Sequence, residues 1–276
     1  MTTSETIGAR ANEVSAMTAR QRLIVVLLLG ANFMMSADFS ILNIALPVVG
    51  EAVGLGVNNL PWVATAFALP AAGLSLLFGR LGDLYGRRRI FLIGLSLLAA
   101  ASFLGGVSTG PALLLAARAL QGVASAMAVP AALSLLITTF ADERQRAWVL
   151  GLNGSLLSAG FTVGAIAGGT LVGVLSWRWA FLINVPVALA ILAFTPVVVP
   201  AGHSPAGVRL DVPGAASVTL GLFAVALGIT QPSLLALMAG LVLLALFFGS
   251  SAGQRRHWSR SRCWRGRRSD GAILRR

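Results

Sequence analysis

Two ionisable side chains lie inside long apolar stretches of this 276-residue sequence, where they could do chemistry. Asp38 is the only carboxylate deep within such a stretch, and Arg118 is the only base deep within another. A charge in these surroundings is unfavourable unless it faces water or a partner. Asp38 is therefore a candidate acid for proton coupling or cation binding. The alternative is a structural acid near a helix end, held by hydrogen bonds.

Arg118 also has two interpretations. It lies close to the outer end of its apolar stretch, so its long side chain could reach back to the membrane surface. It could instead point inward and influence Asp38 by charge. An Asp38–Arg118 pair is compatible with the sequence, which does not establish it.

Enzymatic chemistry finds no support in the remaining polar residues. The two histidines form no cluster with acids that would suggest a metal site, and the single cysteine, Cys263, excludes an intrachain disulfide. No serine in an apolar stretch has a histidine base nearby, and no GK[ST] sequence suggests ATP-driven work. We therefore predict no enzyme activity, no metal and no cofactor.

The composition indicates the elements that must position Asp38 and Arg118. Hydrophobic residues make up 57% of the chain and charged residues 11%, against about 25% charged in a soluble domain. The mean hydropathy is +0.84. A bilayer core of roughly 30 Å needs about 20 apolar residues as helix. Reading the spans as gaps between charges predicts eight helices, at 23–47, 59–79, 90–108, 112–140, 147–175, 179–199, 213–230 and 233–249.

The fold expected from these spans is an all-α polytopic membrane protein. We divide it into a cytoplasmic N-terminal tail (1–21), a six-helix bundle (22–199), a cytoplasmic loop with two further helices (200–249) and a basic cytoplasmic tail (250–276). The break between the last two helices is Gln231-Pro232, because proline disfavours helix in the residue before it.

The arginines predict the orientation. All 21 basic residues are arginines, and the formal net charge is +12. Nearly all of them fall on the side that holds the N-terminus, which the positive-inside rule places in the cytoplasm. Both termini are then cytoplasmic, and Trp177 and Trp179 lie at the outer interface, where an aromatic belt is expected.

Nine of the arginines lie in 254–276. This tail is either a basic segment that binds anionic lipid or an out-of-frame translation. In so apolar a chain the basic charge indicates a membrane flank, and no nucleic acid partner is expected.

The stretch 79–89, GRLGDLYGRRR, lies between the second and third spans. It resembles the G-x-L-a-D-r-x-G-r-k signature of the major facilitator superfamily. The conformational motif would comprise Gly79, Asp83, Gly86, Arg87 and Arg88. Physically, the two glycines permit a tight turn and a close helix approach, and Asp83 can pair with an arginine or cap a helix.

Three further stretches resemble the fourteen-helix drug:proton antiporter branch of that superfamily. They are 38–47 (DFSILNIALP), 118–122 (RALQG) and 177–186 (WRWAFLINVP). The two extra spans after the sixth are similar to that branch as well. The resemblance implies that Asp38, Asn43, Arg118 and Gln121 serve proton coupling or substrate binding.

Glycines in the fifth span form another pattern. Gly160, Gly164 and Gly168 are four apart and share one helix face, where small residues allow helices to approach closely. The resemblance adds that 160–169, which includes Gly169, corresponds to the antiporter motif g-x-x-x-G-P-x-x-G-G. Its proline is replaced here by Ala165, which weakens the expected kink.

The resemblance implies proton-coupled efflux of lipophilic, often cationic, small molecules by alternating access. The proton gradient would supply the energy without a cofactor, and the protein would be a multi-pass component of the inner (plasma) membrane. Its partners would be the lipid bilayer and a small-molecule substrate. The sequence leaves open whether two copies pair to replace an absent second bundle. The alternatives are a truncated, non-transporting fragment and a membrane-anchored interaction protein.

Overall fold

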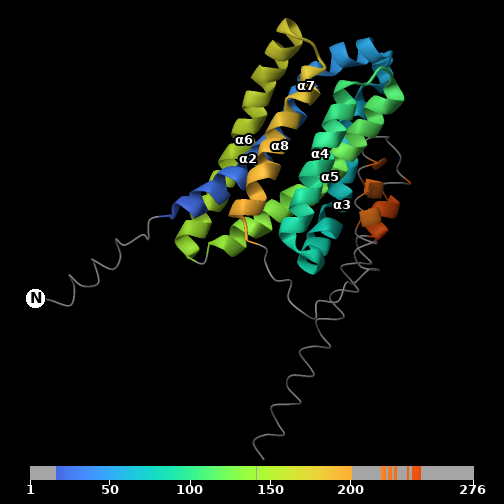
Figure 1. Cartoon of the computed structure of the whole chain (residues 1–276). Helices are drawn as coiled ribbons and strands as arrows, with labels where there is room; N and C mark the ends of the chain where they lie inside the picture. Colours follow the sequence, from blue (N-terminus) through green and yellow to red (C-terminus); the bar gives the residue numbers. More distant parts are fainter. Residues whose placement is uncertain are drawn as a thin grey trace, which may run out of the picture.

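The computed structural model describes residues 17–140 and 142–200, together with short helical pieces at 219–221, 223–225, 227–228, 235 and 238–243. The main part is a bundle of helices standing side by side (Figure 1). Its elements are α2 (Ala19–Val53), η1 (Val57–Asn59), α3 (Pro61–Tyr85), α4 (Arg87–Gly106), α5 (Pro111–Thr139), α6 (Glu143–Val174), α7 (Trp179–Leu182) and α8 (Asn184–Val198).

Within these described residues there is no strand, and six helical segments are long and apolar enough to cross a membrane. The prediction of an all-α membrane protein with a six-helix bundle is therefore confirmed. The predicted spans 213–230 and 233–249 lie largely outside the described residues, which include only helical pieces of them. Residues 1–16 of the predicted N-terminal tail (1–21) also lie outside the described residues, and so does the whole of the predicted tail 250–276.

Two helices extend well beyond one or both ends of their predicted spans, α2 and α3. α2 begins earlier because Thr18 and Gln21 form a capping box, and it ends where Gly54 adopts φ 75°. Pro47 lies inside it and does not end it. α3 passes the predicted end at Gly79 and continues to Tyr85. Charges mark where the apolar stretch ends, and a helix can continue into water beyond that point.

The sixth predicted span, 179–199, corresponds to one apolar segment, Trp179–Val198, that is divided into two helices at Ile183. α7 ends at Leu182 and α8 starts at Asn184, with Ile183 between them. The sequence reason is Pro186, which has no N–H to donate to the Leu182 carbonyl four residues earlier. Proline is tolerated in the first turn of a helix, so α8 can begin there.

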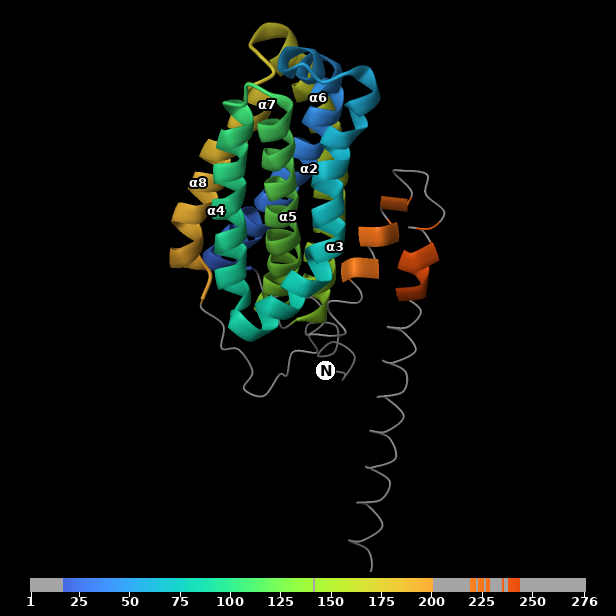
Figure 2. The same cartoon turned by 90° about the vertical axis from the view of Figure 1, so that its right-hand side faces the viewer.

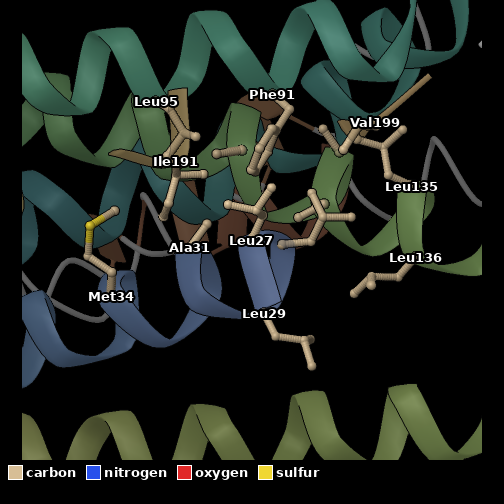
Figure 3. Close-up of a cluster of buried hydrophobic side chains, with 14 of the residues drawn as sticks. Leu27, Leu29, Ala31, Met34, Phe91, Leu95, Leu135, Leu136, Ile191 and Val199 are labelled. Atoms are coloured by element: carbon tan, nitrogen blue, oxygen red, sulfur yellow. The ribbon is translucent and has the colours of Figure 1, made fainter. Parts of the chain in front are cut away.

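Helix pairs organise the bundle: α5 packs against α3 and α4, α2 packs against α6, and α8 packs against α4 and α2. Figure 2 shows α3, α4 and α5 in one layer with α2 behind them. The larger core lies where α2, α4, α5 and α8 meet, and Figure 3 shows Leu27, Phe91, Leu95 and Ile191 converging there. These four side chains are at most 6% exposed.

The N-terminal end of α2, the α3–α4 turn and the C-terminal end of α8 lie at the same end of the bundle (Figure 1). There Arg20 Nε donates to the Val198 carbonyl at 2.9 Å, and Arg88 Nη2 donates to the Pro196 carbonyl at 2.9 Å. The last turn of α8 carries no basic residue of its own. Two other helices thus supply the positive charge that favours a helix C-terminus.

Candidate functional site

Asp38 and Arg118 form an ion pair inside the bundle. Arg118 Nη1 lies 3.0 Å from Asp38 Oδ2, and each side chain is 1% exposed. Asp38 lies in the middle of α2, not near its end, and Arg118 is fully buried rather than extended to the surface. The expected place of Asp38 near a helix end and the outward reach of Arg118 are therefore wrong, whereas hydrogen bonds do hold Asp38, as its structural alternative has it. Each charge neutralises the other, which is the condition for a charged group to persist in such a place.

Two amides complete the coordination of the Asp38 carboxylate. Gln121 Nε2 donates to Asp38 Oδ1 at 3.3 Å, and Asn184 Nδ2 also donates to Oδ1. Oδ2 accepts from Arg118. The carboxylate thus accepts hydrogen bonds from three donors, two on α5 and one on α8. A carboxylate has only acceptor capacity, so a set of donors suits its ionised form.

Gln121 also links the pair to a fourth helix. Its Oε1 accepts from Arg118 Nη1 at 2.8 Å, and its Nε2 donates to Ser102 Oγ on α4 at 2.9 Å. All three residues are buried. The predicted site residues Asp38, Arg118 and Gln121 are therefore brought together in one closed polar cluster.

The helix α3 covers Arg118 from another side. Arg118 Nε donates to the Val63 carbonyl at 3.3 Å, and its guanidinium lies 4.5 Å from the centre of the Phe67 ring. Phe67 in turn contacts Phe39, with ring centres 5.6 Å apart. A cation over an aromatic face is a favourable arrangement when both are removed from water.

Gly122 explains the last position of the 118–122 motif. A Cβ built on Gly122 would collide with the backbone carbonyl of Phe67. The glycine therefore allows α5 to approach α3 closely, and this approach sets the Phe67 ring over Arg118. The three motif residues thus differ in role: Arg118 pairs with Asp38, Gln121 links the pair to α4, and Gly122 allows α3 and α5 to approach closely.

Asn43 does not join this cluster. Its Nδ2 donates to the Phe39 carbonyl one turn back on α2, at 2.8 Å, and its side chain is half-buried. The residues that sequence reasoning missed are Asn184, Ser102 and Phe67. Asn184 had a signal, because it belongs to the 177–186 stretch. Ser102 and Phe67 are ordinary residues of apolar spans and had none.

The glycine face of α6 lies against α2. Cβ atoms on Gly160, Gly164 and Gly168 would come within 3.0 Å of the carbonyl oxygens of residues 33, 37 and 41 in turn. Gly169 has open space around it and takes no part in this contact. Two hydroxyls bond across the same seam: Ser36 Oγ and Ser40 Oγ donate at 2.6 Å to the carbonyls of residues 157 and 161. The predicted face is thus the seam that holds the helix bearing Asp38.

The predicted conformational motif forms a separate cluster at the α3–α4 turn. Gly86 has φ 99°, so a single residue reverses the chain between the two helices. Asp83 Oδ1 accepts from Arg87 Nη2 at 2.9 Å and does not cap α4. Arg87 Nη1 donates to the Ser134 carbonyl on α5 at 3.3 Å, while Arg88 contacts α8 as described above.

Gly79 was expected to form the tight turn together with Gly86, and it does not. It lies inside α3, where a Cβ would meet Pro130 Cβ on α5 at 3.9 Å, which is ordinary contact. The tight turn depends on Gly86 alone.

The aromatic belt prediction is wrong for one of its two residues. Trp177 is 6% exposed and stacks edge-on against Phe181, with ring centres 6.3 Å apart. Arg178 lies 4.6 Å above the Trp177 ring and donates to the Ser108 carbonyl at 3.2 Å. Trp179 is 45% exposed, as an interface residue can be. Sequence alone could not tell the two apart, because both flank the same arginine.

Metal chemistry has no candidate site in the part of the chain that the structure describes: no three His, Cys, Asp or Glu side chains group together there. What the described bundle does hold is a neutralised ion pair between membrane-spanning helices, joined to amides from two further positions. Ionisable side chains inside membrane-spanning helices mark candidate sites for substrates, ions or protons.

Comparison with known proteins gives the family. The sequence model of the Major Facilitator Superfamily matches residues 28–261, so the chain belongs to this superfamily of transporters. The family and the relatives indicate a transporter and not an enzyme.

Two curated relatives carry names related to antibiotics. The puromycin resistance protein of Streptomyces alboniger is 41% identical over 190 residues, which are 69% of this chain and 38% of that protein. The cephamycin export protein of Amycolatopsis lactamdurans is 38% identical over 227 residues, which are 81% of this chain and 46% of that protein. The chain thus spans less than half the length of these relatives.

Solved structures share the fold. The human organic anion transporter MFSD10 matches with a TM-score of 0.61 at 20% identity, over 76% of this chain and 55% of that one. An auto-inhibited peptide transporter of the POT family matches with a TM-score of 0.63 at 15% identity, over 82% and 52% of the two chains.

Proposed function

We propose that this bundle provides the proton-binding site of an exporter for lipophilic, often cationic, small molecules. The observation that carries the proposal is the Asp38–Arg118 pair, 3.0 Å apart and fully buried between membrane-spanning helices. The relatives named for puromycin resistance and cephamycin export support a small-molecule exporter. The energy would come from the proton gradient, with no cofactor.

The charges of the cluster suggest how exchange could work. With Asp38 ionised, the pair is neutral overall. With Asp38 protonated, the Arg118 charge is left without its counter-ion, and the cluster carries one net positive charge. A cation nearby is repelled by that state in a medium of low dielectric constant. Proton and cationic substrate therefore exclude each other, which is the requirement for antiport; alternating access would carry the two in opposite directions.

The orientation belongs to the same proposal. The arginines of the α3–α4 turn and Arg20 lie at one end of the bundle, where Arg20 and Arg88 bond carbonyls at the C-terminus of α8. The positive-inside rule places that end in the cytoplasm of a cell with a plasma membrane, and both termini with it.

The test needs two bundles, because the chain spans less than half of its relatives. Residues 22–199 would replace the corresponding segment of the Streptomyces alboniger puromycin resistance protein. Efflux of a dye cation from cells or vesicles would then be measured under an imposed pH gradient. Asp38→Asn should abolish gradient-driven efflux, whereas Glu51→Gln, an exposed acid on the same helix, should not. Unchanged efflux in the Asp38 variant would remove Asp38 from proton coupling.

A second candidate function, a membrane-anchored interaction protein, rests on the nine arginines of 254–276. That segment lies outside the described residues. Deleting it from the full chain separates the two candidates: loss of function would implicate the tail, and retention would implicate the membrane-spanning helices.

A further inference from the structure

We infer that Asn184 is a positioning residue for Asp38: it fixes the orientation of the carboxylate and thereby selects the oxygen that takes the proton. The inference rests on the proposed function, because it concerns the same acid. It goes further because it gives a role to Asn184 of the 177–186 stretch, a residue to which the proposed function assigns none.

The hydrogen bonds divide unequally between the two oxygens of Asp38. Oδ1 accepts from two neutral amides, Gln121 on α5 and Asn184 on α8. Oδ2 accepts from Arg118 alone. Asn184 is 2% exposed, so no water competes for its amide from the surface. Without it, both donors to the carboxylate would come from α5, and nothing on the side of α8 would hold the carboxylate plane.

This arrangement predicts where a proton goes. Protonation turns one carboxyl oxygen into a donor and removes an acceptor site. At Oδ1 it would disturb two hydrogen bonds, whereas at Oδ2 it would displace one. The displaced group is Arg118 Nη1, which already has a second acceptor, Gln121 Oε1, at 2.8 Å. Proton uptake at Oδ2 therefore separates the ion pair while Oδ1 stays fixed by the amides.

The local structure explains how Asn184 reaches Asp38. Asn184 is the first residue of α8 and directly follows Ile183, whose φ of −61° and ψ of −28° keep the backbone helical from α7 into α8. The preceding segment is anchored at α4: Phe181 packs where a Cβ on Gly105 would collide with its ring, and Arg178 bonds the Ser108 carbonyl. One end of 177–186 is thus fixed to the end of α4, and the other end reaches Asp38.

The test is infrared difference spectroscopy of the full chain in lipid between low and high pH. The C=O band of protonated Asp38 is assigned by its loss in Asp38→Asn. In the arrangement above, that C=O is Oδ1, which accepts from two amides. Removing one donor raises a C=O stretching frequency, so Asn184→Leu, which is nearly the same size, should shift the band upward.

Two further variants keep the result decisive. Asn184→Ser is polar and suits a helix N-terminus, but its side chain is too short to reach Oδ1, and it should shift the band in the same direction. Thr195→Val removes a buried hydroxyl from the same helix. That hydroxyl donates to the Ile191 carbonyl one turn back, so the variant should leave the band in place.

An unmoved band in both Asn184 variants overturns the positioning role and leaves the proposed function intact. An equal shift in Thr195→Val overturns it too, because the effect would then be a general distortion of α8. Absence of any Asp38 band in the unmodified chain overturns both the inference and the proposed function.

Discussion

The bundle contains two Arg–Asp pairs of nearly equal length in opposite surroundings. Asp38–Arg118 is 3.0 Å long with both side chains 1% exposed, and its partners come from helices 80 residues apart in sequence. Asp83–Arg87 is 2.9 Å long with side chains 31% and 34% exposed, and its partners are one helical turn apart. Distance alone does not distinguish the pairs, so any difference in energy comes from what surrounds them.

The surroundings give each pair a different dependence on its partners. Water can replace either member of the exposed pair. In the buried pair each charge depends on the other and on Gln121, Asn184 and Phe67. Loss of one member leaves an uncompensated charge in the interior. We therefore expect the buried pair to control both stability and function, and the exposed pair to adjust the turn between α3 and α4.

Arg118→Met should have the largest effect, because it leaves the Asp38 carboxylate buried without a counter-charge. Breaking one side of a buried pair costs about 3–5 kcal/mol. The free energy of unfolding in mixed micelles, measured by denaturing-detergent titration, should fall by that order.

The double variant Asp38→Asn with Arg118→Met tests whether the uncompensated charge of Asp38 causes the loss of stability. Removing both charges should recover much of the stability lost in Arg118→Met, because replacing a whole buried pair by neutral groups is often nearly neutral. A double variant as unstable as Arg118→Met would show that the arginine matters for its packing and not for its charge.

The glycine seam that holds the helix of the buried pair should give the next largest effect. A Cβ on Gly164 would lie 2.8 Å from Ala37 Cα, the residue next to Asp38, and backbone cannot move aside as a side-chain end can. Gly164→Ala should lower the free energy of unfolding by up to about 3 kcal/mol through overpacking.

Gly169→Ala is the matched control, because nothing lies within 4 Å of its Cβ position. It should be neutral or stabilising by roughly 0.5–1 kcal/mol, the ordinary gain of alanine over glycine in a helix. Equal effects at the two positions would refute the close approach of α6 to α2.

The comparison also shows what the sequence could and could not predict. Asp38 and Arg118 were visible because a charge in an apolar stretch has few explanations. Their pairing was not, because it depends on how α2 and α5 meet. Asn184, 146 residues from Asp38, was one polar residue of a motif with no assigned partner.

The fold followed from composition to a large extent, since six spans were found within a few residues of the helices. Their ends were less predictable. At α3 the charges marked the end of the apolar stretch at Gly79, but the helix itself runs on through Arg80 and Asp83 to Tyr85. The glycine face of α6 was predicted from its spacing of four, but the α2 carbonyls that it meets required the structure.

At the exposed pair, the turn should matter more than the ion pair. Gly86 has φ 99° and ψ 121°, outside the left-handed helical region, and holding an L residue in so sparsely populated a region costs roughly 1–3 kcal/mol. Gly86→Ala should lower the free energy of unfolding by about that amount. Gly110→Ala is the control: it also precedes a helix, but its φ is −155°, which any residue adopts. A destabilised Gly110 variant would mean that helix boundaries in general, rather than the positive φ, are sensitive.

The smallest effect is expected for Arg87→Met, which removes the exposed pair itself. Partly exposed ion pairs contribute roughly 0–1 kcal/mol, and water can solvate the Asp83 carboxylate that remains. Salt should weaken what contribution there is, because the Debye length shortens from about 10 Å at 0.1 M to about 3 Å at 1 M ionic strength and then becomes comparable to the distance between the paired atoms. The free energies of unfolding of the unmodified chain and the variant should therefore converge as salt is added. Arg118→Met should keep its full deficit in the same titration, because ions do not reach a pair that is 1% exposed. A parallel salt response of the two arginine variants would mean that burial is not what separates the two pairs.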